Sequence, residues 1–316
     1  MLHLECHCFV KIMAHARCTD ADRTAWLTRF RAAGAGTSRP DMLTIKACRR
    51  EIWEQTKAYV QSQQHGELCG RHFFAQKVTC PDSLANVRGT WRAHVLNQDI
   101  LDVAWTLCKQ GKKVAVLNMA SDTKAGGGVA DGAGAQEENL YRRTDMCSSM
   151  ESNQRRLYPL KGQALLSYPV MLLRGREDDG YPFLTPPVPI SVISCAAVRR
   201  PWLDDCGGYD SWKIQRKMQS SIRNILEAAV RSRCDVLLLS AFGCGAYKNP
   251  PHEVAKIFKQ ELSNRNLCQV IFCIRDDHNA GRGHNPNGNY AVFQDFFPCC
   301  KMSWHGWHCH ICGAQW

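Results

Sequence analysis

The segment AGGGVADGAGAQEENLYRR, residues Ala125–Arg143, is the most informative stretch of this sequence. Its three consecutive glycines, Gly126–Gly128, permit positive φ angles and let the backbone approach a ligand closely. Seven residues later comes the run Gln136-Glu137-Glu138, at the start of an apparent helix. The helix dipole favours acids at that position and explains them in part. It does not explain the glycines, and a carboxyl held against a sugar could act as general acid at a glycosidic bond.

Apolar stretches on both sides of this segment predict alternating strands and helices. The expected strands are Val114–Asn118, Ile190–Ser194, Val236–Ser240 and Val270–Ile274. The expected helices cover Leu43–Val60, Ile100–Leu107 with Gly111 as the stop, the stretch between Asp210 and Arg231, and the residues after Asn249, the candidate N-cap, with Pro250 near the first turn. This alternation predicts an α/β fold, with a mixed sheet covered on both faces and ligands at the C-terminal ends of the strands.

A second glycine-rich loop, SAFGCGAYKNPP at Ser240–Pro251, follows one of these strands. Its run Gly243-Cys244-Gly245-Ala246 could offer a row of backbone N–H groups to a diphosphate. The loop matches neither the Walker A pattern nor GxGxxG, and a tight strand-to-helix turn is the alternative. Because no activating base lies near Cys244 in the sequence, we interpret it as a small loop residue and not as a nucleophile.

Length and composition narrow the class of protein. The chain has 316 residues and 18 cysteines, and its formal net charge is +11. It has no run of roughly 20 apolar residues and no signal peptide, so we expect an intracellular protein and no membrane partner. Many cysteines lie within apolar runs, as expected of reduced thiols. The positive charge favours polyanions, but no recognised DNA- or RNA-binding motif predicts sequence-specific nucleic-acid binding.

The C-terminal residues 298–316 are rich in Cys, His and Trp. Cys309 and Cys312 have the spacing of zinc ligands, and Cys300 with His305 would complete a structural site. The alternative is a tail that binds no metal.

Three motifs, in order, carry a resemblance to a known family. The pattern GGG-x7-QEE at Gly126–Glu138 resembles the signature of microbial-type poly(ADP-ribose) glycohydrolases, and Ser240–Asn249 is similar to that family's diphosphate loop. The run Asp276–Asn279, with Gly288–Tyr290 and Phe293, resembles its C-terminal end. The resemblance spans roughly residues 23–297. It implies a macrodomain-like core at residues 94–297, a helical N-terminal accessory segment at residues 1–93, and the tail at 298–316.

The resemblance also implies a reaction, the hydrolysis of ribose–ribose O-glycosidic bonds in poly(ADP-ribose), with no cofactor. Glu138 would be the general acid and base, Glu137 would hold ribose hydroxyls, and Gln136 would steady both acids. The other residues assigned to the substrate are Asn118, Gly126, Gly127, Gly128 and Val129 at the scissile ribose, Gly243, Cys244, Gly245 and Ala246 at the diphosphate, and Tyr247 on the terminal ribose. Tyr247 stands where the family has Phe.

Three other functions stay open from the sequence. A non-catalytic reader of ADP-ribose would use both loops but would not need Gln136-Glu137-Glu138. An enzyme acting on mono-ADP-ribosylated proteins could share the same pocket. A zinc-dependent nucleic-acid factor would leave both glycine loops unexplained. The resemblance implies poly(ADP-ribose) and ADP-ribosylated proteins as the partners.

Overall fold

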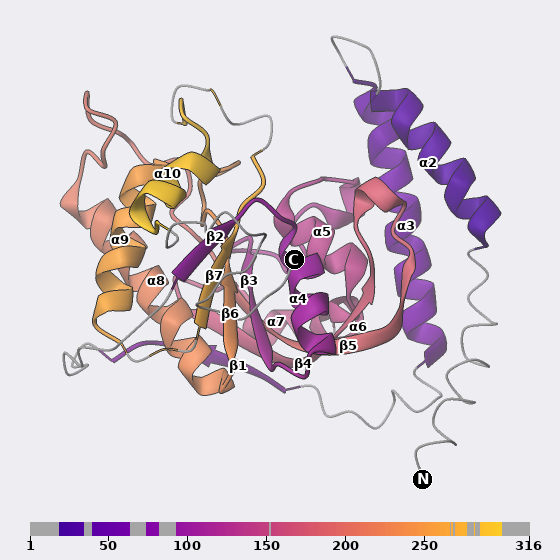
Figure 1. Ribbon diagram of the computed structural model, residues 1–316, viewed down its shortest axis with the longest axis horizontal. Helices are drawn as coiled ribbons and strands as arrows, with labels where there is room; N and C mark the ends of the chain where they lie inside the picture. Colours follow the sequence, from indigo (N-terminus) through magenta and orange to yellow (C-terminus); the bar gives the residue numbers. More distant parts are fainter. Residues whose placement is uncertain are drawn as a thin grey trace, which may run out of the picture.

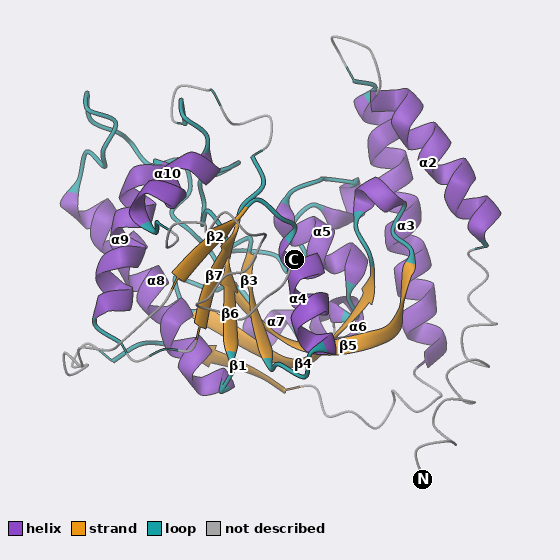
Figure 2. Cartoon of the chain, in the orientation of Figure 1, coloured by secondary structure: helices purple, strands orange, loops and turns teal. Residues whose placement is uncertain are grey.

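A seven-stranded mixed sheet runs through the protein, with helices on both of its faces (Figure 1, Figure 2). The computed structural model describes residues 19–34, 40–63, 74–81, 93–151, 153–265, 267, 269–276, 281 and 285–298. The strands are β1 (Phe74–Val78), β2 (Ala93–Leu96), β3 (Val114–Met119), β4 (Ala164–Arg174), β5 (Phe183–Cys195), β6 (Val236–Leu239) and β7 (Gln269–Cys273).

The strand order is β1-β4-β5-β3-β6-β7-β2. The pairs β5–β3, β3–β6, β6–β7 and β7–β2 are parallel, whereas β1–β4 and β4–β5 are antiparallel. The sheet is therefore mixed, and the four strands expected from the sequence are β3, β5, β6 and β7. The carboxyl ends of β3 and β6 are neighbours, so the two glycine-rich loops leave the same edge of the sheet.

The first four residues of strand β3, Val114–Leu117, are all apolar because both faces of the strand are covered. Val114 and Val116 pack into one core, and Ala115 and Leu117 pack into the other. Side chains alternate between the faces of a strand, so a continuous apolar run is what a two-sided burial requires.

The helices divide between the two cores. The first core includes residues of α3 (Met42–Gln63), α4 (Ile100–Lys109), α5 (Gln136–Arg143), α6 (Met146–Glu151) and α7 (Gln154–Leu157). The second includes residues of α8 (Trp212–Ser232), α9 (Pro251–Ser263) and α10 (Asn289–Phe296). Two short 3-10 turns, η2 (Val129–Asp131) and η3 (Glu177–Asp179), lie in connecting loops.

The N-terminal residues supply helices and also part of the sheet. Helix α2 (Asp20–Gly34) packs on α3, where the indole of Trp26 donates to the Cys48 carbonyl at 2.9 Å. Strand β1 lies within the residues expected to form a helical accessory segment, yet it pairs with β4. The sheet therefore begins before residue 94.

One helix boundary differs from the sequence expectation. We expected Asn249 to cap the helix that follows the second glycine loop, but the N-cap of α9 is Pro250, and Pro251 begins the helix. The Asn249 amide instead donates to the carbonyls of Val198 and Gly243, at 2.7 and 3.0 Å. Asn249 is thus a brace between two loops and not a helix cap.

Every helix among the described residues is too short or too polar to span a membrane. The same residues contain no group of three or more His, Cys, Asp or Glu side chains that could hold a metal ion. The predicted zinc ligands Cys300, His305, Cys309 and Cys312 lie outside the described residues, as does the stretch 277–279.

Candidate active site

Gln136 attaches the start of α5 to the end of β3. Its side-chain amide donates to the Leu117 carbonyl at 2.8 Å and accepts from the Met119 N–H at 2.9 Å. The N–H of Ala120 bonds to β5, so the Met119 N–H faces the opposite edge, where pairing with β6 has already ended at Val116. Gln136 therefore completes the strand's hydrogen bonds and fixes the position of the two acids that follow it.

Glu137 is buried, with 4% of its surface exposed, and both of its carboxyl oxygens are occupied. One accepts from the Ser121 N–H at 2.7 Å, and the other from the Gly126 N–H at 3.1 Å. Burial raises the pKa of Glu137 to about 8, and the charge of Glu138 adds to the rise, while the two N–H bonds oppose it. Glu137 thus holds both ends of the Ser121–Gly126 loop and retains a proton at neutral pH.

Glu138 differs from Glu137 in that one of its oxygens is unused. Oε1 accepts from the Gly128 N–H at 2.9 Å, whereas Oε2 is buried without a hydrogen-bond partner. A buried, unpaired carboxyl oxygen is costly, and it is retained most readily where a ligand supplies the missing partner. The structure therefore distinguishes the two acids, and Glu138 is the one with a buried oxygen that has no hydrogen-bond partner.

Gly127 lies directly against both carboxyl groups. Its φ is +52°, and a Cβ there would stand 2.6 Å from Glu138 Oε1 and 2.9 Å from Glu137 Oε2. At Gly126, with φ of +77°, a Cβ would meet the ring of Tyr141 at 2.8 Å. The first two glycines of the triplet are thus required by left-handed backbone and by close approach at once.

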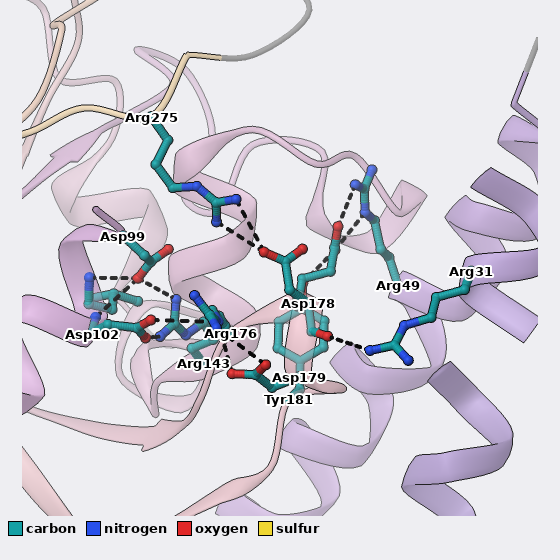
Figure 3. Close-up of polar contacts among 12 residues, drawn as sticks. Arg31, Arg49, Asp99, Asp102, Arg143, Arg176, Asp178, Asp179, Tyr181 and Arg275 are labelled. Carbon is teal, nitrogen blue, oxygen red and sulfur yellow. Dashed lines mark hydrogen bonds and ion pairs between the residues drawn. The ribbon is translucent and has the colours of Figure 1, made fainter. Parts of the chain in front are cut away.

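Helix α3 packs directly on the loop between the triple glycine and α5, which we did not expect from the sequence. A Cβ on Gly132 would overlap the Lys46 backbone, and one on Gly134 would overlap the Arg49 guanidinium. Arg49 itself forms a two-pronged ion pair with Glu177, at 2.9 and 2.8 Å (Figure 3). The small residues of this loop therefore leave room for the N-terminal helix.

The positive charge of Arg49 interacts with Glu177 and also with Glu138. Burial lowers the pKa of Arg49, but Glu177, Tyr181 and Glu138 together raise it above its usual value. Tyr181 donates to Glu177 at 2.7 Å and accepts from Arg142 at 3.0 Å, and Arg142 donates to the Ala133 carbonyl at 2.7 Å. This chain of hydrogen bonds joins α3, η3 and α5 to the loop between the triple glycine and α5.

The last residue of α5 is held by a second network. Arg143 is fully buried and donates to Asp99 at 2.8 Å and to Asp102 at 2.6 Å (Figure 3). Asp99 also caps α4 by accepting from the Leu101 and Asp102 N–H groups. Both ends of α5 are thus fixed, the first by Gln136 and the last by Arg143. The only sequence signal for this role was the pair of arginines at the end of a short helix.

The second glycine loop is held in shape by its own backbone and by Asn249. Gly243 has φ of +75°, and a Cβ there would overlap Ala197. The Asn249 carbonyl oxygen accepts from the Tyr209 hydroxyl at 3.0 Å. Cys244 is completely buried, and burial raises the pKa of its thiol. A buried neutral thiol is a poor nucleophile, which agrees with its interpretation as a small loop residue.

Tyr247 brings the two loops to one site. It is half-buried, and its pKa is raised by burial and further by the negative charges of Asp122 and Glu137. Asp122 belongs to the first loop and Glu137 to α5. Tyr247, in the second loop, therefore lies within electrostatic range of Asp122 and Glu137. Among the other residues assigned to the substrate, Gly245 and Tyr247 are partly exposed, and Ala246 is exposed.

Three more polar side chains around the acids have unused atoms. Asn118 is buried and donates to Ser194 at 3.0 Å, but its Oδ1 has no partner. The hydroxyls of Tyr141 and Tyr158 are also buried without partners, and the charge of Glu137 contributes to raising the pKa of each, after burial. The two tyrosines carry no sequence motif, so only their burial beside Glu137 reveals them. Val129, also assigned to the substrate, is buried in the first core.

A mixed sheet covered on both faces, with two glycine loops and a buried acid pair at the strand ends, defines a macrodomain-like α/β protein. Residues 36–168 match the family model "Microbial-type PARG, catalytic domain", where PARG stands for poly(ADP-ribose) glycohydrolase. The resemblance drawn from the sequence is thereby confirmed, and residues 36–168 are similar to the microbial-type PARG catalytic domain.

Solved structures agree with this assignment. The poly(ADP-ribose) glycohydrolase of Thermomonospora curvata, bound to the inhibitor ADP-HPD, is 25% identical; the match covers 79% of this chain and 99% of that chain, with a TM-score of 0.61. The Deinococcus radiodurans enzyme, in complex with ADP-ribose, is 22% identical over 76% of this chain and 97% of that chain, with a TM-score of 0.57. No curated protein sequence matches the chain.

Proposed function

We propose that this protein is a poly(ADP-ribose) glycohydrolase, which hydrolyses the ribose–ribose O-glycosidic bond and releases ADP-ribose. The observation that carries the proposal is the buried, unpartnered Oε2 of Glu138, held in place by the Gly128 N–H. A reader of ADP-ribose would gain nothing from a second carboxyl that costs desolvation energy. The family match and the ADP-ribose-bound relative from Deinococcus radiodurans support the same substrate.

Hydrolysis needs a general acid to protonate the glycosidic oxygen and then a general base to activate the attacking water. Burial raises the pKa of Glu137 to about 8, so this acid is neutral beside Glu138 at neutral pH. In the proposed reaction Glu138 donates its proton to the departing ribose oxygen as the C–O bond breaks. Glu138, now ionised, then takes a proton from the water that attacks the oxocarbenium-like carbon. The proton balance of the pair is restored at the end of the cycle.

The remaining residues bind and orient. Gly126–Gly128, Val129 and Asn118 would surround the scissile ribose, and Gly243–Ala246 would bind the diphosphate through backbone N–H groups. The side chain of Tyr247 would pack on the terminal ribose. Backbone donors suffice to hold a diphosphate, so we propose that hydrolysis requires no metal. Structural zinc in the tail stays a separate prediction.

The partners would be poly(ADP-ribose) and ADP-ribosylated proteins, since the net charge of +11 attracts such polyanions. The nine described cysteines are free thiols. They fit the predicted intracellular, reducing location.

The test is ADP-ribose release from poly(ADP-ribose) by the unmodified protein, by Glu138→Gln and by Glu137→Gln. We expect Glu138→Gln to lower turnover by a factor of about 10² to 10⁴ while ADP-ribose binding is retained, because Gln keeps the shape and removes the transferable proton. Binding without any cleavage by the unmodified protein would favour the reader. Cleavage only of mono-ADP-ribosylated protein would favour the deblocking enzyme. Equal cleavage by Glu138→Gln would contradict the role of Glu138.

A further inference from the structure

Two tryptophans beside the second glycine loop are exposed to solvent to an unusual degree. Trp202 is 79% exposed and Trp212 is 63% exposed, the highest values among the large aromatic residues in the described ranges. Trp202 belongs to the connection between β5 and α8, which projects from the body of the molecule at the upper left of Figure 1, and Trp212 is the first residue of α8. Exposed aromatic side chains that are held in place commonly mark binding surfaces.

This connection is fixed to the second glycine loop. The Arg200 N–H donates to the Tyr247 carbonyl at 2.7 Å, and the Tyr209 hydroxyl donates to Asn249 at 3.0 Å. The Asp210 N–H donates to the Trp202 carbonyl at 3.3 Å, which brings the two tryptophan-bearing ends of the connection together. The aromatic residues are thus carried by a braced loop that begins at the edge of the candidate site.

Cations lie near the rings of Trp212 and Tyr247. Arg216 and Lys213 lie 5.4 and 5.9 Å from the Trp212 ring centroid, and Arg199 lies 6.0 Å from that of Tyr247. The same connection also contains acids, of which Asp204 accepts the Cys206 and Gly208 N–H groups and shapes the turn; the others are Asp205 and Asp210. Aromatic rings next to Arg and Lys are the combination that stacks bases and pairs with phosphates.

The position of the connection relative to the acids indicates which part of a polymer it would meet. In the proposed function Tyr247 packs on the terminal ribose, and the connection is hydrogen-bonded to Tyr247 through the Arg200 N–H at 2.7 Å. In poly(ADP-ribose) the scissile bond joins the bound ribose to the adenosine ribose of the next unit, whose base therefore leaves the site on the same side.

We propose that Trp202, Trp212, Arg199, Arg200, Lys213 and Arg216 form a leaving-unit subsite. This subsite stacks the adenine, and pairs with the phosphates, of the ADP-ribose unit beyond the scissile bond. The proposal rests on the proposed glycohydrolase function and adds to it a preference for polymer over substrates that lack a second adenosine.

The test compares two substrates with Trp202→Ala, Trp212→Ala and the control Phe74→Ala. Phe74 is 51% exposed, but it lies at the start of β1, an edge strand that β4 separates from β5. The substrates are poly(ADP-ribose) and an aryl ADP-ribose whose leaving group is a small phenol. We expect Trp202→Ala to lower kcat/KM on the polymer on the order of tenfold, since stacking one base contributes about that factor. On the aryl substrate it should match the unmodified protein, and the control should be unchanged on both.

The possible results separate this proposal from the one on which it rests. If the unmodified protein cleaves neither substrate, the glycohydrolase function fails. If it cleaves both and the two tryptophan variants do so equally well, the subsite alone is refuted. If Trp202→Ala lowers kcat/KM on both substrates alike, the subsite is also refuted, because the defect would then concern the ADP-ribose unit that both substrates share. A single-stranded oligo(dA) that binds through Trp202, while polymer cleavage is unaffected by Trp202→Ala, would assign the surface to nucleic acid and overturn the proposal.

Discussion

Glu137 should make the protein less stable as the pH rises from 5 to 7, and Glu137→Gln should remove that dependence. The folded-state pKa is about 8, against an ordinary value of 4.5, because burial penalises the charged form. Between these two values the folded state binds the proton more tightly than the unfolded state. The favourable contribution of the protonated form is therefore complete below about pH 4.5 and is lost as the pH rises toward 8.

The magnitude follows from the two pKa values. Each unit of difference corresponds to about 1.4 kcal/mol, so raising the pH from 5 to 7 should reduce the free energy of unfolding by about 2–3 kcal/mol through Glu137 alone. Glutamine does not titrate. It keeps one acceptor for the N–H groups of Ser121 and Gly126 but sets its NH₂ against the other, which costs about 1–3 kcal/mol at every pH.

The assay is urea unfolding of both proteins at pH 5, 6 and 7 in one buffer series. The difference in unfolding free energy between unmodified protein and variant isolates Glu137, because every other titrating group is common to both. We expect this difference to shift by about 2–3 kcal/mol in favour of the variant over that pH range. Parallel curves would mean that Glu137 ionises as easily in the folded state as in the unfolded one. The argument that the acid pair retains a proton at neutral pH would then be wrong.

Three further predictions test the scaffold of the site. Gly127→Ala should lower turnover by at least about 100-fold, because its Cβ would displace both carboxyls. The control is Gly111→Ala, at a position with φ of +80° and open space around the Cβ, which should strain the backbone there but keep full turnover. Arg49→Met should reduce the free energy of unfolding by about 2 kcal/mol and lower polymer cleavage, since it removes the ion-pair partner of the largely buried Glu177 carboxylate. Arg50→Met, at an exposed position of the same helix, is its control, and equal behaviour of the two variants in urea unfolding would contradict a stabilising Arg49–Glu177 pair. Cys244→Ala should keep full turnover in the ADP-ribose release assay, whereas a dead but folded variant would restore the nucleophile interpretation.

Much of the fold could be predicted because its signals are local. Strands β3, β6 and β7 are short apolar runs between loop residues, and the helix before Gly111 follows apolar spacing with a glycine stop. The edge strand β1 was missed because its partly exposed residues have no continuous apolar run. Asn249 was interpreted as a helix cap because Asn before proline is a common start signal. Its amide found better acceptors in Val198 and Gly243, which are near only in the folded chain.

The composition of the site was also predictable, but the hydrogen bonds that make its two acids different were not. The glycine triplet and Gln136-Glu137-Glu138 are adjacent in the chain, and glycine's tolerance of positive φ is a property of the residue itself. Arg49 and Glu177 are remote in sequence, so their ion pair and their contact with the first loop had no local signal.

The sequence alone determined which chemical groups this site contains, because strand periodicity, glycine loops and neighbouring acids are written in short stretches of chain. Only the tertiary structure decided how the hydrogen bonding of the two acids differs. Backbone N–H groups from a separate loop occupy both oxygens of Glu137, while Glu138 keeps one oxygen free. Burial then raises the pKa of Glu137 by making its charged form less favourable. Hydrogen-bond occupancy and burial depend on segments that meet only on folding, and no local pattern of residues specifies them.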